Sequence, residues 1–444
     1  MTRAANVEAL MESSLSRDDR EAGERKPRPL SLVAWMIAAK ICCMFGSAAF
    51  ASTLVELSRV WHLDATRAGW ISSAYLLGYA LAVPLLVGLT DRVDARSVYL
   101  AGCAIGAVAF AGFALFADGA WSAFLFQAMA GVSLAGAYMP GLRVLTQRLP
   151  ARTRIRAVPY YTGAFGVGTG LSFLISGWAA ARYGWQAAFV GGAIGSIGAA
   201  ILMTIATWAV PVERDLELAP PGRHPLDFRP VLRNRGVLAY IVAYGGHCWE
   251  LFAFRAWLPT FLRFAGGHPN GAGAALAVPR WSMLIVLIGV PSSIAGAELA
   301  RHWPRDRMLR SFEASSIALS VIGAMSGNLS LACAVLAMFA YNVAITADSG
   351  ALTAATVAAA PAHEQGASLA VYSMVGFGGG AAGPLLVGRA LDLGGGFNHP
   401  QAWYLGFPAM AAGSALAAIA LSVVPPRTPA VARRPAGKAA ASEL

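Results

Sequence analysis

Apolar residues occur along this chain in long runs that are separated by short polar segments. A run of about 20 apolar residues is long enough to cross a bilayer as a helix. Twelve such runs follow one another along the 444 residues, so the pattern predicts an all-α membrane protein with twelve transmembrane helices. The predicted spans are residues 30–57, 68–89, 97–117, 121–146, 157–181, 185–210, 236–264, 279–300, 308–326, 329–357, 366–390 and 402–424.

The polar segments arrange the twelve spans in two groups of six. The longest connection, residues 211–235, contains five arginines and several prolines. We therefore predict a six-helix bundle over residues 30–210, this linker on the cytoplasmic side, and a second six-helix bundle over residues 236–424. The ends, residues 1–29 and 425–444, are predicted to be polar tails, and the first lacks the basic start and the cleavage site of a signal peptide.

Residues of the same type recur at a constant distance in the two predicted halves. Three pairs are separated by 211 residues, namely Pro150 and Pro361, Tyr161 and Tyr372, and Gly177 and Gly388. A constant offset over a matching pattern of spans predicts two pseudo-symmetric halves that are parallel repeats. Transporters built in this way bind their substrate between the repeats, near the middle of the membrane.

The positive charges decide the orientation that the sequence predicts. The formal net charge is +11, but the basic residues lie in short loops between apolar runs, which argues against a nucleic-acid-binding protein. If the N-terminus lies in the cytoplasm, the inside segments hold 25 lysines and arginines and the outside segments hold 6. Since cytoplasmic loops carry the excess of positive charge, both termini are predicted to be cytoplasmic, in the inner membrane of a bacterium.

The cysteines and the missing catalytic motifs argue against several classes of protein. The five cysteines lie within apolar runs and show neither metal-ligand spacing nor a disulfide framework. The chain contains no Walker loop, His-x-x-x-His pair, Cys/His cluster or nucleophile elbow. We therefore expect no metal site, no cofactor and no enzymatic activity. A membrane-embedded enzyme and a passive channel are the alternatives from other classes, and the lack of a filter-like repeat argues against the channel.

The loop after the second predicted span carries a recognisable motif. Residues 88–96 read Gly-Leu-Thr-Asp-Arg-Val-Asp-Ala-Arg, with Asp91 and Arg92 at the centre. This loop resembles the Asp-Arg signature of the major facilitator superfamily, which joins the second and third spans on the cytoplasmic side. The match is partial, because the family pattern has a glycine where this chain has Val87.

A weaker second copy of this loop follows the eighth span, where Ala300 stands in place of the aspartate. The resemblance implies a major facilitator transporter, whose two six-helix halves move against each other by alternating access. The aspartate of the first loop would then pair with an arginine and latch the halves together on the cytoplasmic side. The predicted latch residues are Asp91, Arg92, Arg96, Arg301 and Arg305, and ordinary positive charge in inside loops is the alternative reading of these arginines.

Glycines are concentrated in the fifth and eleventh predicted spans. Small residues allow membrane helices to approach each other closely. We therefore predict close helix packing at Gly166, Gly170, Gly379, Gly383 and Pro384. Direct contact of these segments with the substrate is the alternative.

Ionisable residues interrupt the seventh predicted span. His247, Glu250 and Arg255 lie inside the apolar stretch of residues 236–264. An ionisable side chain inside a membrane is costly, so it indicates a functional site by default. His247 and Glu250 are three residues apart, which places them on one helical face. Arg255 follows Glu250 by five residues, about 140° further round the helix, so it need not share that face.

Two more charges lie inside predicted spans, Lys40 in the first and Asp348 in the tenth. Lys40 and Arg255 against Glu250 and Asp348 give two charges of each sign, which predicts that they pair around a water-filled cavity. Other interpretations remain open. Arg255 could extend toward the membrane surface, and Asp348 could belong to a purely structural pair.

These residues suggest a division of roles. The predicted substrate contacts are Lys40, His247, Trp249, Glu250 and Arg255, with the two cations holding an anion. Glu250, His247 and Asp348 are predicted to carry a proton, because carboxyl and imidazole groups in a buried site can bind and release protons. The aromatic residues around Trp249 could instead serve in packing.

The sequence therefore predicts a secondary transporter that moves a small anion or organic acid, coupled to protons. Within the superfamily, it looks most like the cyanate permease group of small-anion permeases. A drug–proton antiporter that binds an apolar cation at Glu250 is the alternative. The expected partners are the lipid bilayer, the solute and protons, without nucleic acid, and the expected state is a monomer.

Overall fold

The computed structural model describes residues 29–208, 228–267, 272–361 and 364–423, which form helices and short turns without a strand. Nearly all of the predicted tails, and residues 211–227 of the predicted linker, lie outside the described residues. The helices are α2 (Pro29–Cys43), α3 (Ala49–Val60), α4 (Ala65–Leu89), α5 (Ala95–Phe116), α6 (Ala120–Gln147), α7 (Ala151–Tyr183), α8 (Trp185–Trp208), α9 (Arg229–Arg233), α10 (Arg235–Ala265), α11 (Ala272–His302), α12 (Arg305–Ser326), α13 (Leu331–Ala347), α14 (Ser349–Ala359), α15 (Gln365–Leu393) and α16 (Pro400–Val423).

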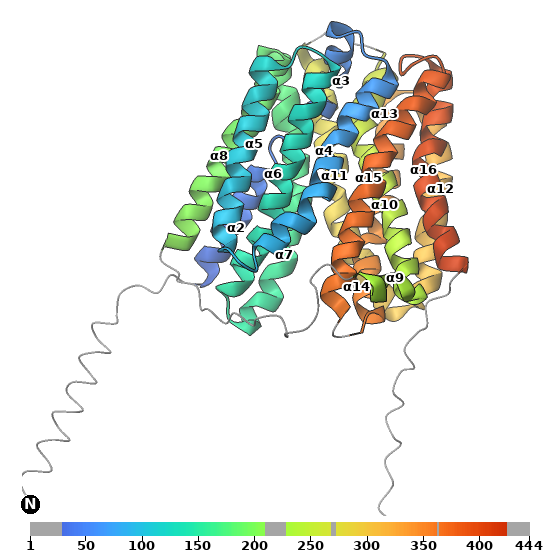
Figure 1. The fold of residues 1–444 in the computed structure, drawn as a ribbon. Helices are drawn as coiled ribbons and strands as arrows, with labels where there is room; N and C mark the ends of the chain where they lie inside the picture. Colours follow the sequence, from blue (N-terminus) through green and yellow to red (C-terminus); the bar gives the residue numbers. More distant parts are fainter. Residues whose placement is uncertain (1–28, 209–227, 268–271, 362–363, 424–444) are drawn as a thin grey trace, which may run out of the picture.

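The helices form two groups that lie side by side, α2–α8 and α10–α16, and the short helix α9 leads into the second group (Figure 1). Ten helical segments of the described chain are long and apolar enough to cross a membrane. The broken pair α2–α3 and the more polar helix α12 supply two further crossings. The predicted fold of twelve transmembrane helices in two halves is therefore confirmed.

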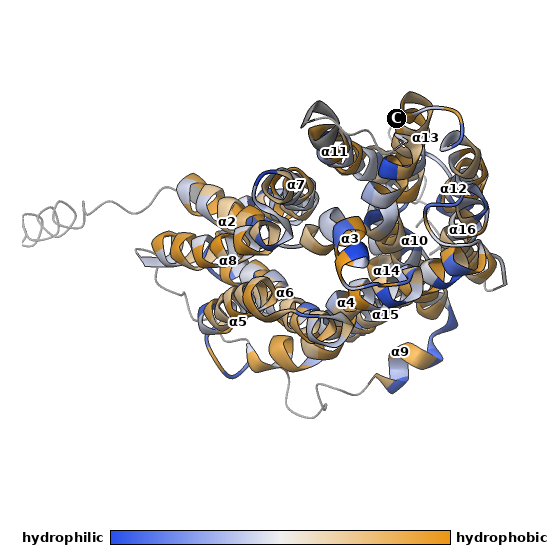
Figure 2. Cartoon of the chain, turned by 90° about the horizontal axis from the view of Figure 1, so that it is seen from above, coloured by the Kyte–Doolittle hydropathy of each residue, from blue (hydrophilic) through white to orange (hydrophobic). Residues whose placement is uncertain are grey.

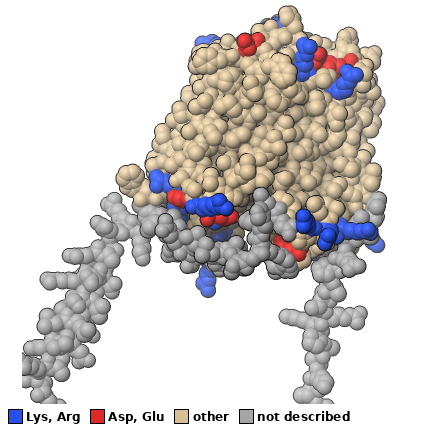
Figure 3. All heavy atoms as spheres, in the orientation of Figure 1, with Lys and Arg blue, Asp and Glu red and all other residues tan. Residues whose placement is uncertain are grey.

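The start of α2 and the end of α16 lie at the same end of the bundle, the lower end in Figure 1. We call this end the tail face and the opposite end the far face. Charged side chains gather at these two ends and leave a broad uncharged belt between them (Figure 3). Seen along the helices, apolar residues are spread over nearly all of the crossing helices (Figure 2). Large apolar side chains such as Leu85, Leu125, Ile194 and Leu336 are exposed on the surface. This surface suits hydrocarbon rather than water.

The first span, predicted over residues 30–57, is divided in the structure into α2 and α3. The helix breaks at residues 44–48, where short i→i−3 hydrogen bonds replace the α-helical ones. The Ser172 hydroxyl on α7 accepts a hydrogen bond from Ala48 N at 2.9 Å and donates one to Phe45 O at 2.7 Å. Irregular backbone is tolerated inside a membrane when a neighbouring side chain satisfies it.

The tenth span, predicted over residues 329–357, is also divided. Asp348 lies at the break, as the residue that follows the last turn of α13 and precedes the first turn of α14. On the other side of the break, α11 comes so close that a Cβ on Gly296 would overlap with the Ala347 carbonyl oxygen. Neither break could be predicted from hydropathy, because an apolar run has the same appearance whether or not one turn of its helix is interrupted.

The two halves contact each other through α4 with α15 and through α7 with α11. At the contact of α4 and α15, a Cβ on Gly69 would overlap with the carbonyl oxygen of Pro384. Likewise, a Cβ on Gly388 would overlap with the carbonyl oxygen of Ala65. The two backbones therefore touch, which only glycine permits at these positions.

The glycines that the sequence singles out lie at two kinds of helix contact. Gly166 and Gly170 on α7 face α11 of the other half, where an added Cβ would meet the side chains of Val290 and Leu287. Gly379 and Gly383 on α15 face α10 of their own half, and an added Cβ at either position would overlap with a backbone carbonyl. The first kind of contact therefore joins the halves and the second lies within one half.

At the far face, a carboxylate from one half caps a helix of the other. Asp392 near the end of α15 accepts hydrogen bonds from Ala65 N at 2.9 Å and from Thr66 N at 2.8 Å, both at the start of α4. The Thr66 hydroxyl donates a third hydrogen bond at 2.5 Å. A carboxylate is favoured at a helix N-terminus by the free N–H groups and by the helix dipole. Asp392 therefore holds the two halves together at the far face.

Replacing Asp392 with alanine should loosen this closure, since all three hydrogen bonds depend on its carboxylate. We expect a membrane-impermeant thiol reagent, added from the far face, to label a cysteine at Ser72 about ten times faster in Asp392→Ala. Such a change corresponds to about 1.4 kcal/mol of lost closure. The measurement requires a background in which the five native cysteines are replaced.

Asp64→Ala is the matched control. Asp64 caps the same end of α4, but its carboxylate contacts its own helix, namely the backbone N–H and the guanidinium of Arg67. An equal labelling rate in Asp392→Ala and in the parent would show that this contact does not hold the halves together.

Candidate functional site

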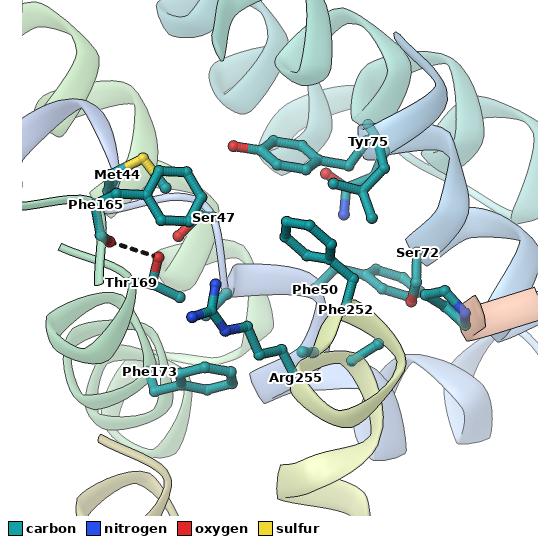
Figure 4. Close-up of a pocket in the computed structure, with 16 residues that line it drawn as sticks. Met44, Ser47, Phe50, Ser72, Tyr75, Phe165, Thr169, Phe173, Phe252 and Arg255 are labelled. Atoms are coloured by element: carbon teal, nitrogen blue, oxygen red, sulfur yellow. Dashed lines mark hydrogen bonds between the residues drawn. The ribbon is translucent and has the colours of Figure 1, made fainter. Parts of the chain in front are cut away.

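A cavity lies between the two halves, at the level of the break in the first span (Figure 4). Its empty space, including the part open to solvent, is about 590 Å³. The first half contributes Met44, Ser47, Ala48, Phe50, Ala51, Ser72, Tyr75, Leu76, Gln127, Phe165, Thr169 and Phe173, and the second half contributes Phe252, Arg255, Ala256 and Pro384. The lining is thus mostly apolar and aromatic, with a few polar groups, which is typical of a small-molecule site.

Arg255 supplies the positive charge of this cavity. Figure 4 shows its guanidinium directed toward Phe165 and Thr169. The guanidinium lies over the rings of Phe165 and Phe252, each with its centroid 5.8 Å away. Its Nε has no hydrogen-bond partner, and within the described part of the chain Arg255 forms no ion pair. A half-buried cation that lies between aromatic faces and forms no ion pair can bind an anion that carries an apolar body.

Glu250 lies on the same helix, but it faces the interior of the second half rather than the cavity. Its Oε1 accepts a hydrogen bond from the Tyr341 hydroxyl at 2.6 Å. Its Oε2 accepts one from Ser316 at 2.9 Å and another from Ser414. The hydroxyl groups come from α12, α13 and α16, so this carboxylate is held by three helices of its own half.

His247 and Asp348 lie beside Glu250, together with a residue that the sequence analysis overlooked, Glu313 on α12. His247 Nδ1 is 2.8 Å from Asp348 Oδ1, although the angles are not those of a hydrogen bond. The Glu313 and Asp348 carboxyl groups are neighbours in the interior of the second half. Glu313 Oε1 and Asp348 Oδ1 are buried without a hydrogen-bond partner, and two neighbouring carboxylates repel each other when both are ionised. We call His247, Glu250, Glu313 and Asp348 the acidic cluster.

The prediction that the buried cations pair with the buried carboxylates is wrong. Among the described residues, neither Lys40 nor Arg255 forms an ion pair with the acidic cluster. Within the cluster, His247 and Asp348 are in close contact. The cations lie at or beside the cavity, whereas the carboxylates lie inside the second half. The physical reason is that aromatic rings and hydroxyl groups stabilise the two signs separately.

Lys40 and Trp249 do not line the cavity. The Lys40 side chain is fully buried, with its Nζ 4.0 Å from the centroid of the Tyr138 ring and 5.3 Å from that of Phe165. The Trp249 indole donates a hydrogen bond to Ala409 O on α16 at 3.0 Å. Trp249 therefore joins two helices of the second half, which fits packing better than the predicted substrate contact.

The predicted latch is not formed across the halves in this structure. The Asp91 carboxylate pairs with Arg143 on α6, within the first half. In the second copy of the loop, Arg301 pairs with Glu298 on its own helix at 2.9 Å. Arg92, Arg96 and Arg305, the other predicted latch residues, lie in or beside the short turns that join the helices at the tail face. The hydrogen bonds of Asp392, described above, instead join the halves at the far face.

Comparisons with known proteins agree with this architecture. The model of the Major Facilitator Superfamily matches residues 36–384. The chain is 23% identical to a gallate transporter of Pseudomonas putida, over 88% of this chain and 93% of the relative. It is 28% identical to a 3-(3-hydroxy-phenyl)propionate transporter of Escherichia coli K12, over 76% of this chain and 81% of the relative.

Solved structures share the fold. A bacterial homolog to the human lysosomal transporter Spinster, in an inward-facing and unoccupied conformation, superposes with a TM-score of 0.73 at 15% identity. The match covers 90% of this chain and 96% of that one. Since the family model matches most of the chain and the fold agrees, the chain belongs to the Major Facilitator Superfamily and is a multi-pass membrane transporter, not an enzyme.

Proposed function

We propose that this transporter carries small aromatic carboxylates across the bacterial inner membrane by alternating access, coupled to protons. The observation that carries the proposal is Arg255, an unpaired guanidinium in an aromatic cavity between the halves. Because the cavity is formed by both halves, a rocking movement of one half against the other would open it to either side in turn.

The shape and chemistry of the cavity support a ring that bears a carboxylate. A guanidinium binds a carboxylate through two parallel hydrogen bonds, and Arg255 has donors free for this. Phe165, Phe252 and Tyr75 offer ring faces for stacking. The substrates named for the two relatives, gallate and 3-(3-hydroxyphenyl)propionate, are molecules of this kind. A cationic drug would meet repulsion from Arg255, so the antiporter alternative has less support.

The distribution of charge supports an orientation with the tail face in the cytoplasm. Counted over the whole sequence, loops and tails on this side hold 25 lysines and arginines, against 6 on the far side. This asymmetry is typical of cytoplasmic loops. The closure at Asp392 would then lie on the outer side of the membrane.

We propose the acidic cluster as the binding site of the coupled proton. Glu250 already accepts three hydroxyl hydrogen bonds, whereas Glu313 Oε1 and Asp348 Oδ1 are buried without a hydrogen-bond partner. A proton shared by these two carboxyl groups would relieve the repulsion between them. An imidazole next to this pair, that of His247, could pass the proton on. We therefore place the transported proton on Glu313 and Asp348, with Glu250 and His247 as neighbours.

Replacing Arg255 with methionine should remove the charge that holds the carboxylate. We expect the KM for gallate or 3-(3-hydroxyphenyl)propionate to rise about a hundredfold, which equals about 3 kcal/mol of lost binding. The KM of Arg255→Lys should lie between those of wild type and Arg255→Met, because an ammonium keeps the charge but lacks the planar pair of donors. Uptake of each acid into proteoliposomes measures these constants.

Arg263→Met is the matched control. Arg263 lies two turns further along α10 and takes no part in the cavity, so its loss should leave KM near the wild-type value. If Arg255→Met and Arg263→Met gave the same KM, the carboxylate would not bind at Arg255.

Neutral variants of the proton pair should separate proton coupling from substrate movement. Glu313→Gln and Asp348→Asn cannot bind and release a proton, so a pH gradient should no longer drive accumulation of substrate. Counterflow, which exchanges substrate for substrate without net proton movement, should persist in both. Comparing the two assays in the same proteoliposomes checks this expectation.

Glu298→Gln is the control, since Glu298 is an exposed carboxylate of α11 that pairs with Arg301. Accumulation equal to wild type in both cluster variants would exclude the pair as the coupling group. If Glu250→Gln alone were uncoupled, the proton would belong to Glu250 instead.

A further inference from the structure

Lys40 is a buried cation for which the described part of the chain supplies no hydrogen-bond partner. Its side chain has no exposed surface, and its Nζ has no hydrogen-bond partner. Nζ lies over two aromatic rings, those of Tyr138 on α6 and Phe165 on α7. No carboxylate among the described residues pairs with it.

Aromatic contacts alone do not offset the cost of burying this charge. A desolvated cation–π contact contributes about 2 kcal/mol, whereas removing an ammonium from water costs several times more. The remaining cost is met when an anion binds beside the ammonium. Lysine side chains that serve only packing extend their charge to the surface, and Lys40 does not.

The position of Lys40 relates it to the cavity. Lys40 precedes Met44, which lines the cavity, by about one turn of α2 and lies on the tail-face side of it. Phe165 forms the shared wall. Its ring centroid is 5.8 Å from the Arg255 guanidinium and 5.3 Å from Lys40 Nζ. A change in the side-chain conformation of Phe165 would therefore join Lys40 to the cavity.

We infer that Lys40 forms a second carboxylate site, to which the substrate anion moves from Arg255 on its way to the tail face once Phe165 swings aside. This inference rests on the proposed function, because it takes the substrate to be a small carboxylate. The two sites would be used in turn: Arg255 when the cavity is open to the far face, and Lys40 when it is open to the tail face. Lys40 thus adds affinity on one side of the membrane alone.

The test compares KM from the two sides of the membrane. Right-side-out and inverted vesicles that contain wild type, Lys40→Met, Lys40→Arg or Arg255→Met are given gallate, or 3-(3-hydroxyphenyl)propionate if wild type transports only that acid. For Lys40→Met, we expect KM from the tail face to rise at least tenfold more than KM from the far face. Arg255→Met should raise KM from both faces. Lys40→Arg, which keeps the positive charge, should restore part of the tail-face affinity.

Each outcome decides the inference. The KM from the far face, measured on the same preparation, shows that Lys40→Met is folded and active. An equal rise from both sides would mean that Lys40 and Arg255 form a single site, and an unchanged KM from both sides would mean that Lys40 is structural; either result overturns the second site. If wild type itself transports neither acid, the proposed function fails, and this failure is visible without any variant.

Discussion

The cost of placing a charge inside a membrane is the constraint on which this structure depends. The chain meets it by separating the two signs. Lys40 and Arg255 are stabilised by aromatic rings at or beside the cavity, whereas Glu250, Glu313 and Asp348 are surrounded by hydroxyl groups, by His247 and by one another. The cations and carboxylates therefore do not neutralise each other, and on the proposed function the first group is left to bind an anion and the second to bind a proton.

The sequence predicted the crossing helices well because the thickness of a bilayer fixes the length of an apolar run. The helical period also indicated that Arg255 and Glu250 need not share a face, and in the structure one lines the cavity while the other faces the second half. Differences at helix ends have a simple cause. α7 begins at Ala151 rather than at residue 157, since its arginine-rich first turns are helical although they are not apolar.

The parts of the site that the sequence could not predict depend on contacts between distant residues. The break at residues 44–48 is satisfied by Ser172, more than 120 residues away. The direction of Trp249 is set by a carbonyl on α16. Glu313 was overlooked because it lies near the start of the predicted span 308–326, close behind several arginines, where a charge is common. Its burial beside the other carboxylates distinguishes it in the structure.

The helix α10 connects the two groups of charges. It presents Arg255 to the cavity and, five residues earlier, Glu250 to the acidic cluster, a rise of about 7.5 Å along one rigid element.

A ligand changes the balance between two conformations only by binding one of them more tightly. A carboxylate bound between Arg255 and the first half would hold α10 in one position relative to α4 and α7. The hydroxyl groups around Glu250 come from α12, α13 and α16, so any tilt of α10 against those helices also changes the environment of the proton. On the proposed function, substrate and proton are therefore coupled through the position of a single helix, without a direct contact between their binding groups.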